Sequence, residues 1–150
     1  MDKWELKNEL GELFCRIEYD AANGWLQATW NNFVTYDIIK QGCEAILEMI
    51  KEYNCNKLLV DTFLAKGPWA QTNEWQEKDF LPRTVEAGLR YTAFVVSRNS
   101  FNALSAKDLE KRTEKLDLEM VYFQDLLEAK VWLKGKPPQD RRDACPTSGN

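Results

Sequence analysis

Apolar and polar residues alternate along two stretches near the start of the chain. From residue 13 every second side chain is apolar, namely Leu13, Cys15, Ile17 and Tyr19. A period of two is typical of a half-buried strand. Residues 20–24 close with Asn23 and Gly24, which adopt positive φ at little cost, and residues 25–30 supply a returning strand. The pattern therefore predicts a β-hairpin, with residues 1–11 as an extended lead-in that could form an edge strand.

A period of three to four residues follows the hairpin. The apolar positions with this spacing are Ile39, Cys43, Ile46, Ile50 and Tyr53. They predict an amphipathic helix over residues 36–53 that packs on the sheet, with Thr35 as its N-cap. Gly42 lies inside that helix, where glycine costs about 1 kcal/mol relative to alanine. We expect close contact between helix and sheet to be the reason for it.

The centre of the expected fold is residues 57–63, Lys-Leu-Leu-Val-Asp-Thr-Phe. Residues 58–60 form an apolar run without polar alternation, which is typical of a strand covered on both faces. Asp61 and Thr62 follow where this strand should end. Ligands and partners of parallel sheets usually bind at the carboxyl ends of the strands. We therefore expect the working site here, beside the turn at residues 67–69 (Gly-Pro-Trp).

The remaining pattern alternates helices with strands. Thr72 or Asn73 could cap a second helix that reaches Val85, kinked or divided at Pro82 and ended by Gly88. The elements predicted after it are a strand over residues 89–96, an exit loop over residues 97–100, a helix over residues 106–115 capped by Ser105, a strand over residues 118–123 and a helix over residues 126–133 capped by Asp125.

This order of elements predicts the fold class. An opening hairpin followed by alternating helices and strands gives an α/β fold with a mixed, largely parallel sheet and crossover helices. Residues 1–134 should form one domain, because a chain of 150 residues that is 44% apolar or aromatic can build a single core. Residues 135–150 have three prolines and no large apolar side chain, which predicts a disordered tail with Cys145 as the most exposed thiol.

Composition and charge exclude several classes of function. The 24 acidic and 20 basic side chains give a net charge of −4, which argues against nucleic acid as a partner. No run approaches the ~18 apolar residues of a membrane span, and the N-terminus lacks the apolar run of a signal peptide. The four cysteines match no metal-binding or redox spacing, so reduced thiols in a cytoplasm are the simpler interpretation.

Histidine is absent from the chain. Its absence removes the commonest general base, the usual partner of a catalytic serine and the commonest zinc ligand. The sequence therefore predicts no catalytic residue, no metal site and no cofactor.

Several short motifs together resemble those of a known family. They are the apolar strand ending in Asp61, the pair Glu74-Trp75, the pair Leu81-Pro82, residues 87–89 (Ala-Gly-Leu), residues 93–96 (Ala-Phe-Val-Val) and the ending over residues 129–133. Over residues 12–134 the chain resembles the SpoIIAA-like proteins of the STAS superfamily, which includes anti-sigma factor antagonists and the cytoplasmic domains of sulfate transporters. The resemblance implies a STAS fold and a regulatory or ligand-binding role.

The chain departs from that family at one motif. Phospho-switch members have Asp-Ser-Ser/Thr-Gly at a helix start after the third strand, where the serine is phosphorylated. Residues 61–75 contain no serine, and only Thr62 and Thr72 supply hydroxyls, so a switch of that type is not expected. Some SpoIIAA-like relatives have instead been proposed to hold apolar ligands near their amphipathic helices, which implies a small carrier as an alternative.

Seven residues near the two strand ends are candidates for binding a ligand or partner: Asp61, Thr62, Trp69, Glu74, Trp75, Arg98 and Asn99. Asp61 could bind a ligand or accept amide hydrogen bonds from its own turn. Trp69, in a Gly-Pro turn, has little reason to be buried, whereas Trp75 at helical spacing fits the core. Glu74 is one of three acidic residues, with Glu77 and Asp79, whose spacing is typical of a solvated helix face. Arg98 could bind an anion or belong to a polar loop.

These residues leave three function hypotheses. The first is a non-enzymatic binding or regulatory module for a protein partner, because no nucleophile–base pair or metal-ligand spacing is present; a homodimer stays open. The second is a carrier for a small apolar or amphipathic ligand, favoured by six tryptophans in one small domain. The third is an enzyme that uses Asp61 or the carboxylates of residues 74–79 for acid–base chemistry, with Arg98 as a charge stabiliser.

Overall fold

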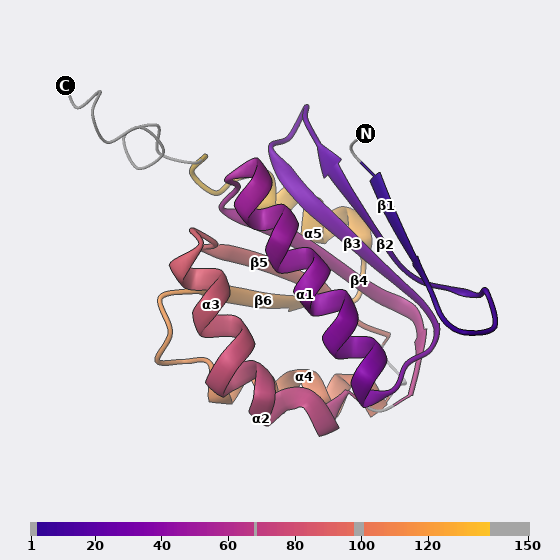
Figure 1. The fold of residues 1–150 in the computed structure, drawn as a ribbon. Coiled ribbons are helices and arrows are strands. Elements are labelled where there is room, and N and C mark those ends of the chain that lie inside the picture. The colour runs from indigo at the N-terminus through magenta and orange to yellow at the C-terminus, as the bar shows by residue number, and fades with distance from the viewer. Residues whose placement is uncertain (1–2, 68, 98–100, 139–150) are drawn as a thin grey trace.

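A computed structural model describes residues 3–67, 69–97 and 101–138 and shows one six-stranded sheet with helices on both faces (Figure 1). The strands are β1 (Lys3–Lys7), β2 (Leu13–Asp20), β3 (Trp25–Phe33), β4 (Lys57–Lys66), β5 (Tyr91–Val95) and β6 (Glu119–Phe123). The helices are α1 (Tyr36–Tyr53), α2 (Asn73–Trp75), α3 (Leu81–Glu86), α4 (Phe101–Arg112) and α5 (Leu126–Lys134), joined by a 3₁₀ turn η1 (Ala70–Thr72) and a π-helical turn η2 (Gln76–Phe80).

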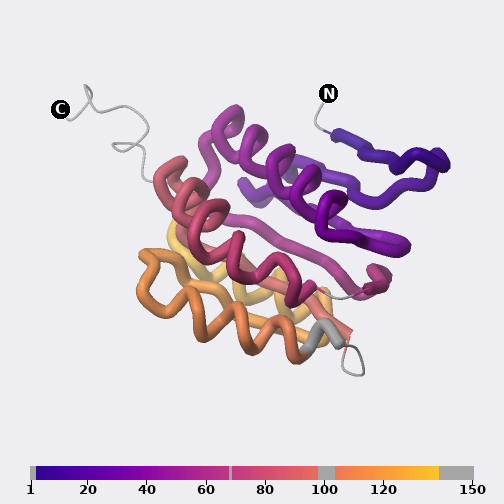
Figure 2. Tube along the Cα trace, turned by 60° about the horizontal axis from the view of Figure 1, so that its bottom comes forward, coloured from indigo at the N-terminus to yellow at the C-terminus, as the bar shows by residue number. Residues whose placement is uncertain are grey.

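The strands lie in the sheet in the same order as in the chain, β1-β2-β3-β4-β5-β6. The first three pair antiparallel, and β3 to β6 pair parallel, which confirms the prediction of an α/β fold with a mixed sheet. Right-handed crossovers that advance one strand at a time all fall on the same side of a sheet. Helices α1, α3 and α4 therefore cover one face, here called the front face, and α5 covers the opposite back face (Figure 2).

The opening hairpin is confirmed. Strands β2 and β3 pair from Asp20↔Trp25 to Cys15↔Trp30, and the carboxylate of Asp20 accepts hydrogen bonds from the backbone and side chain of Asn23 in the turn. The lead-in is an edge strand, β1, paired antiparallel with β2. Strand β3 runs to Phe33, three residues past the predicted end.

Helix α1 has the predicted bounds, and the Thr35 side chain accepts a hydrogen bond from the amide of Ile38 at 3.2 Å. Gly42 lies directly over the indole of Trp30 on β3, where a Cβ atom would come within 2.2 Å of the ring. The expected close contact between helix and sheet is therefore present.

Strand β4 is longer than predicted. It does not end at Asp61 and Thr62 but continues to Lys66, so both residues lie inside the strand. Beside Asp61 the register between β3 and β4 shifts, with Thr29↔Asp61 followed by Asn31↔Leu64. Such a bulge places an extra residue in one strand and lets the strand continue past polar residues that would otherwise indicate its end.

The segment over residues 70–86 changes helix type three times, which agrees with the predicted division near Pro82. Pro82 lies in the first turn of α3, where a missing amide donor costs little. Neither Thr72 nor Asn73 acts as the predicted cap. The Thr72 hydroxyl donates to the Trp69 carbonyl at 2.8 Å, and the Asn73 amide donates to the Ser105 carbonyl at 2.9 Å.

Helix α4 begins at Phe101, so the prediction that Ser105 caps a helix over residues 106–115 is wrong. The polar residues that suggested a cap bind the neighbouring helix. The Asp108 carboxylate accepts hydrogen bonds from Asn73 at 3.0 Å and from Arg112 at 2.8 Å. Strand β6 and helix α5 are confirmed, and Asp125 caps α5 through the amide of Glu128.

Apolar side chains fill both sides of the sheet. The larger core lies on the front face, between the sheet and α1, α3 and α4, and includes Trp30, Ile46, Val60, Trp69 and Leu109. A smaller cluster lies on the back face under α5, with Trp25, Leu59, Ala93, Val95, Ala129 and Leu133. This double cover explains the unbroken apolar run of β4.

Contacts with the domain extend past the predicted boundary at residue 134. The Lys136 ammonium pairs with Glu119 at 3.0 Å and lies 4.9 Å from the Trp132 ring centre. The Asn56 side chain donates to the Pro137 carbonyl at 3.3 Å. The prediction of a disordered tail, with Cys145 in it, otherwise falls on residues 139–150, which lie outside the described residues. No helix in the described part of the chain is long and apolar enough to cross a membrane.

Candidate functional site

One edge of the sheet gathers most of the exposed apolar side chains. Strands β3 to β6 are parallel, and β1 runs in the same direction, so the carboxyl ends of five strands meet there. The turn between β1 and β2 and the starts of α1, α4 and α5 lie at the same edge. We call this region the carboxyl edge; its β3–β4 part lies at the lower right of Figure 1.

Eight large apolar side chains are exposed among the side chains that the structure describes. Seven belong to the carboxyl edge: Leu10, Phe33, Tyr36, Phe63, Leu64, Leu104 and Leu127. The eighth, Val131, lies farther along α5. Single exposed apolar residues are ordinary, but a set confined to one edge is typical of an interaction surface.

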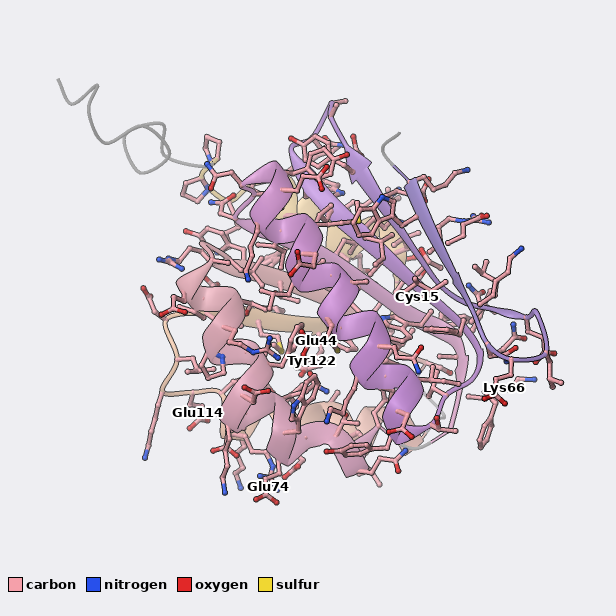
Figure 3. All side chains as sticks on the ribbon, viewed as in Figure 1. Cys15, Glu44, Lys66, Glu74, Glu114 and Tyr122 are labelled. Carbon is pink, nitrogen blue, oxygen red and sulfur yellow. The ribbon has the colours of Figure 1, made fainter. Side chains whose placement is uncertain are left out.

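The centre of this set is the end of the β3–β4 ladder. Phe33, Phe63 and Leu64, here called the apolar corner, are 60%, 53% and 63% exposed. The register pairs Asn31 with Leu64 and Phe33 with Lys66, so these residues share the last steps of one ladder. Lys66 marks this end of β4 in Figure 3.

Gly67 fixes the path of the chain just after the apolar corner. Its φ is +111°, and a Cβ atom there would lie 2.8 Å from the Val34 carbonyl and 3.5 Å from the Phe33 ring. Only glycine adopts that backbone conformation at low cost. The Phe33 ring therefore covers the Gly67 backbone and keeps an exposed outer side.

An open groove lies farther along the carboxyl edge, between the β1–β2 turn and the start of α1. Its volume is about 440 Å³, within the range of ligand pockets. The lining is mixed, with Lys7, Glu9, Leu10, Phe14, Asp37 and Ile38 among its residues. An apolar corner beside a groove with charges of both signs is the usual composition of a protein-binding surface with a polar rim.

Of the seven sequence-predicted site residues the structure describes five, and the side chains of these five bond to or pack on separate partners. One Asp61 oxygen accepts a hydrogen bond from the amide of Phe63 at 3.0 Å, which is the structural alternative considered for it. The Thr62 hydroxyl is buried and donates to the Val95 carbonyl at 2.8 Å. Arg98 and Asn99 lie outside the described residues.

Trp69, predicted to be exposed, is buried. Its indole packs edge-on against Trp30 with ring centres 5.0 Å apart. Trp75 is half-buried and stacks on Phe80 at 5.5 Å, as expected for a core position. The Lys40 ammonium lies 5.2 Å from the ring centres of both Tyr36 and Trp75, which links Trp75 to the carboxyl edge.

The carboxylates of residues 74–79 lie at the surface and form ion pairs with lysine and arginine side chains. Glu74 pairs with Lys78 at 2.9 Å, and Glu77 pairs with Arg112 at 2.9 Å. Arg83 binds Asp79 and, with two hydrogen bonds, Glu44 of α1. The hydrogen bonds from Arg83 lower the pKa of Glu44. Glu44 is labelled on α1 in Figure 3. The pairs of Glu74 and Asp79 lie within the segment, and the pairs Glu77–Arg112 and Arg83–Glu44 connect it to α4 and α1, which are structural roles.

A small cavity lies between the sheet and the irregular segment over residues 70–86. Its volume is about 30 Å³, and its lining is apolar except for Trp69, Gln76 and Thr92. The indole N–H of Trp69 and the hydroxyl of Thr92 are buried without a hydrogen-bond partner among the described residues. Such groups cost free energy unless water or a ligand binds them. The cavity has room for about one or two waters.

The described residues offer little for catalysis. No group of three or more His, Cys, Asp or Glu side chains among them is placed to hold a metal ion. Burial raises the pKa of Cys15 and of Cys55 to about 12, so neither thiol supplies a reactive thiolate near neutral pH.

The sequence pattern does not predict the apolar corner, because Phe33 and Leu64 fall just beyond the predicted strand ends. One signal was available: Phe63 and Leu64 continue the apolar run of β4 after two polar residues. No protein-family model, curated protein or solved structure matches this chain.

Proposed function

We propose that this protein is a non-enzymatic binding module of STAS type, without the phosphorylatable serine motif, that binds a protein partner through the carboxyl edge. The proposal rests on one observation: seven of the eight exposed large apolar side chains described lie at that edge. Their burial in a complex supplies the driving force, at roughly 25 cal/mol per Å² of apolar surface. A cytoplasmic location belongs to the proposal, because Cys15, Cys43 and Cys55 are free thiols.

A protein suits this surface better than a lipid bilayer does. Membrane-binding surfaces add a group of Lys or Arg side chains that attract anionic lipids. The groove next to the apolar corner mixes Lys7 with Glu9 and Asp37, and the whole chain has a net charge of −4. Charges of both signs around apolar residues match the rim of a protein interface.

The test uses a double variant, Phe33→Ser with Leu64→Ser, in cross-linking capture from the source cell. The matched control is Val131→Ser, which removes an equally exposed apolar side chain away from the carboxyl edge. The proposal predicts a partner that the wild type and the control capture and the double variant does not. A partner captured equally by all three would refute it, as would binding of the wild type to anionic vesicles in place of protein.

The buried polar pair favours a second candidate function, a carrier for a small amphipathic ligand. A ligand with one hydrogen-bond acceptor on an apolar body would satisfy the Trp69 N–H and the Thr92 hydroxyl. The cavity of about 30 Å³ is far below the 300–1,000 Å³ of ligand pockets, so residues 70–86 would have to move outward. A π-helical turn in this segment is a feature frequent at functional sites.

Tryptophan fluorescence tests the carrier function. Phenol, cyclohexanone and decanoic acid serve as probes of increasing size, each titrated into the wild type and into Thr92→Val. A carrier predicts saturable quenching with at least one probe that weakens in Thr92→Val. Absence of saturation with all three probes would contradict it, and leaves the proposal about the carboxyl edge unaffected.

A further inference from the structure

Strand β4 extends well past its neighbour β5. It has ten residues, β5 has five, and their pairing stops at Asp61↔Val95. Within the part of the chain that the structure describes, residues 62–66 therefore pair with β3 on one side only. No other backbone in the described part of the chain pairs with the second side of this stretch.

Only part of the hydrogen bonding on the open side of residues 62–66 is supplied by described residues of this chain. Asp61 accepts a hydrogen bond from the Phe63 amide, and the Thr62 hydroxyl donates to the carbonyl at the end of β5. Both hydrogen bonds lie at the last pair of the β4–β5 ladder. Beyond it the strand is flanked by the exposed side chains of Phe63, Leu64 and Lys66. Short, charged or covered edges prevent unwanted pairing in most proteins, whereas this edge exposes Phe63 and Leu64 and has one charged side chain, Lys66, at its end.

We infer that the open side of β4 at residues 62–66 accepts an extended peptide segment of the partner as an added strand. This inference rests on the proposed function and names the kind of partner. Unpaired backbone donors and acceptors along a strand are matched by the backbone of another strand, while side-chain contacts give the specificity. Five residues of strand span about 16 Å, at roughly 3.3 Å per residue, which suits a peptide of four to six residues.

The side chains around the open edge indicate what the peptide contains. Phe63 and Leu64 offer apolar contacts, and side chains on a strand alternate between two faces. A bound segment should therefore have apolar residues at two neighbouring positions, beside Phe63 and Leu64, with an acidic residue favoured near Lys66. A peptide without proline is expected, because proline removes the amide donors that pairing requires.

The experiment selects a random dodecapeptide phage library on the full-length wild-type protein. The inference predicts enriched peptides with neighbouring apolar residues that bind Val131→Ser as they bind the wild type. Binding to the double variant Phe63→Ser with Leu64→Ser should be at least about tenfold weaker, a loss expected for central interface residues. Circular dichroism and urea unfolding establish that the double variant folds, since both side chains are exposed.

Two backbone readouts distinguish strand addition from ordinary side-chain binding. Hydrogen exchange of the amides at residues 62–66 should slow when the peptide binds, and N-methylation at alternate peptide positions should abolish binding. Peptides that bind the apolar corner but tolerate N-methylation everywhere would overturn the added strand and leave the proposed function standing. Failure to enrich any peptide would overturn the inference, as would a dimer of the protein alone that slows the same amides.

Discussion

The indole of Trp30 lies flat against the backbone of Gly42, so close that a Cβ atom at position 42 would come within 2.2 Å of the ring. Trp30 is almost fully buried on β3, and Gly42 is in the middle of α1. The missing side chain lets the helix approach the sheet by the thickness of a methyl group. A residue that weakens the helix locally thus allows the packing of the larger core.

Gly42→Ala should lower the free energy of unfolding by about 1–3 kcal/mol. Alanine gains about 1 kcal/mol of helix propensity, but the overpacking against Trp30 costs more, because a buried indole cannot move aside. Urea unfolding monitored by tryptophan fluorescence measures the change. Gln41→Ala, at an exposed position of the same helix, is the control and should stay within about 0.5 kcal/mol. Increased stability in Gly42→Ala would mean that α1 can shift on the sheet.

Two buried threonines should respond to valine in opposite directions. The Thr92 hydroxyl has no partner among the described residues, whereas the Thr62 hydroxyl donates to the Val95 carbonyl at 2.8 Å. Thr92→Val should raise the free energy of unfolding by about 1 kcal/mol, and Thr62→Val should lower it by about 1 kcal/mol. Parallel thermal and urea unfolding of both variants tests the pair. A destabilised Thr92→Val would show that bound water or a ligand uses that hydroxyl.

Acid should weaken the link between α1 and α3. Hydrogen bonds from Arg83 lower the pKa of Glu44 below its ordinary value of 4.5. A carboxyl with a lowered pKa stabilises the folded state fully above its unfolded value, and this contribution is lost as the pH falls through the folded value. Because Glu44 is half exposed, the contribution should be below about 1 kcal/mol.

Urea unfolding between pH 7 and pH 3 measures this contribution. Wild-type stability should fall below about pH 4.5 more steeply than that of Glu44→Gln, which lacks the titrating group. Glu48→Gln, at an exposed position one turn further along α1, is the control and should follow the wild type. Identical curves for Glu44→Gln and the wild type would show that the Arg83 contact adds no pH-dependent stability.

The three described cysteines should resist labelling in the folded protein. Burial raises the pKa of the Cys15 and Cys55 thiols from 9.0 to about 12 and that of the Cys43 thiol well above 9.0. Each unit by which the pKa rises lowers the thiolate fraction about tenfold. The Cys15 and Cys55 thiols should therefore react about a thousandfold more slowly at pH 8 than an exposed thiol. A Cys145→Ser background restricts the assay to these three. Rapid labelling by a disulfide reagent without denaturant would contradict the burial.

The local sequence pattern was sufficient to predict turns and helix caps, because these depend on residues close together in the chain. The Asn23-Gly24 turn, the Thr35 cap and the Asp125 cap each depend on a few neighbouring residues, and all three are confirmed. The α/β class with a mixed sheet follows from the order of those elements. The STAS resemblance itself stays a prediction.

The predictions that are wrong concern features determined by contacts between residues far apart in the sequence. Asp61 and Thr62 read as a strand end, but pairing with β3 carries the strand past them through a bulge. Ser105 and Asp108 read as a cap, but both bind Asn73 from 32 and 35 residues away. Trp69 follows a turn and is nevertheless drawn inward by contact with Trp30. The candidate site in the structure differs from the predicted one for the same reason, because the length of β4 determines which apolar residues remain exposed.

The identical order of strands in the sheet and in the chain has a consequence for how the protein is made. Each new strand pairs with the one before it, so the sheet can grow along its edge while the chain leaves the ribosome. The back face is different, since Trp25, Leu59, Ala93 and Val95 are covered only when α5 arrives. Until residues 126–134 have been synthesised, a nearly complete sheet therefore presents a bare apolar face, and exposed apolar surface of this kind makes a nascent chain prone to aggregation.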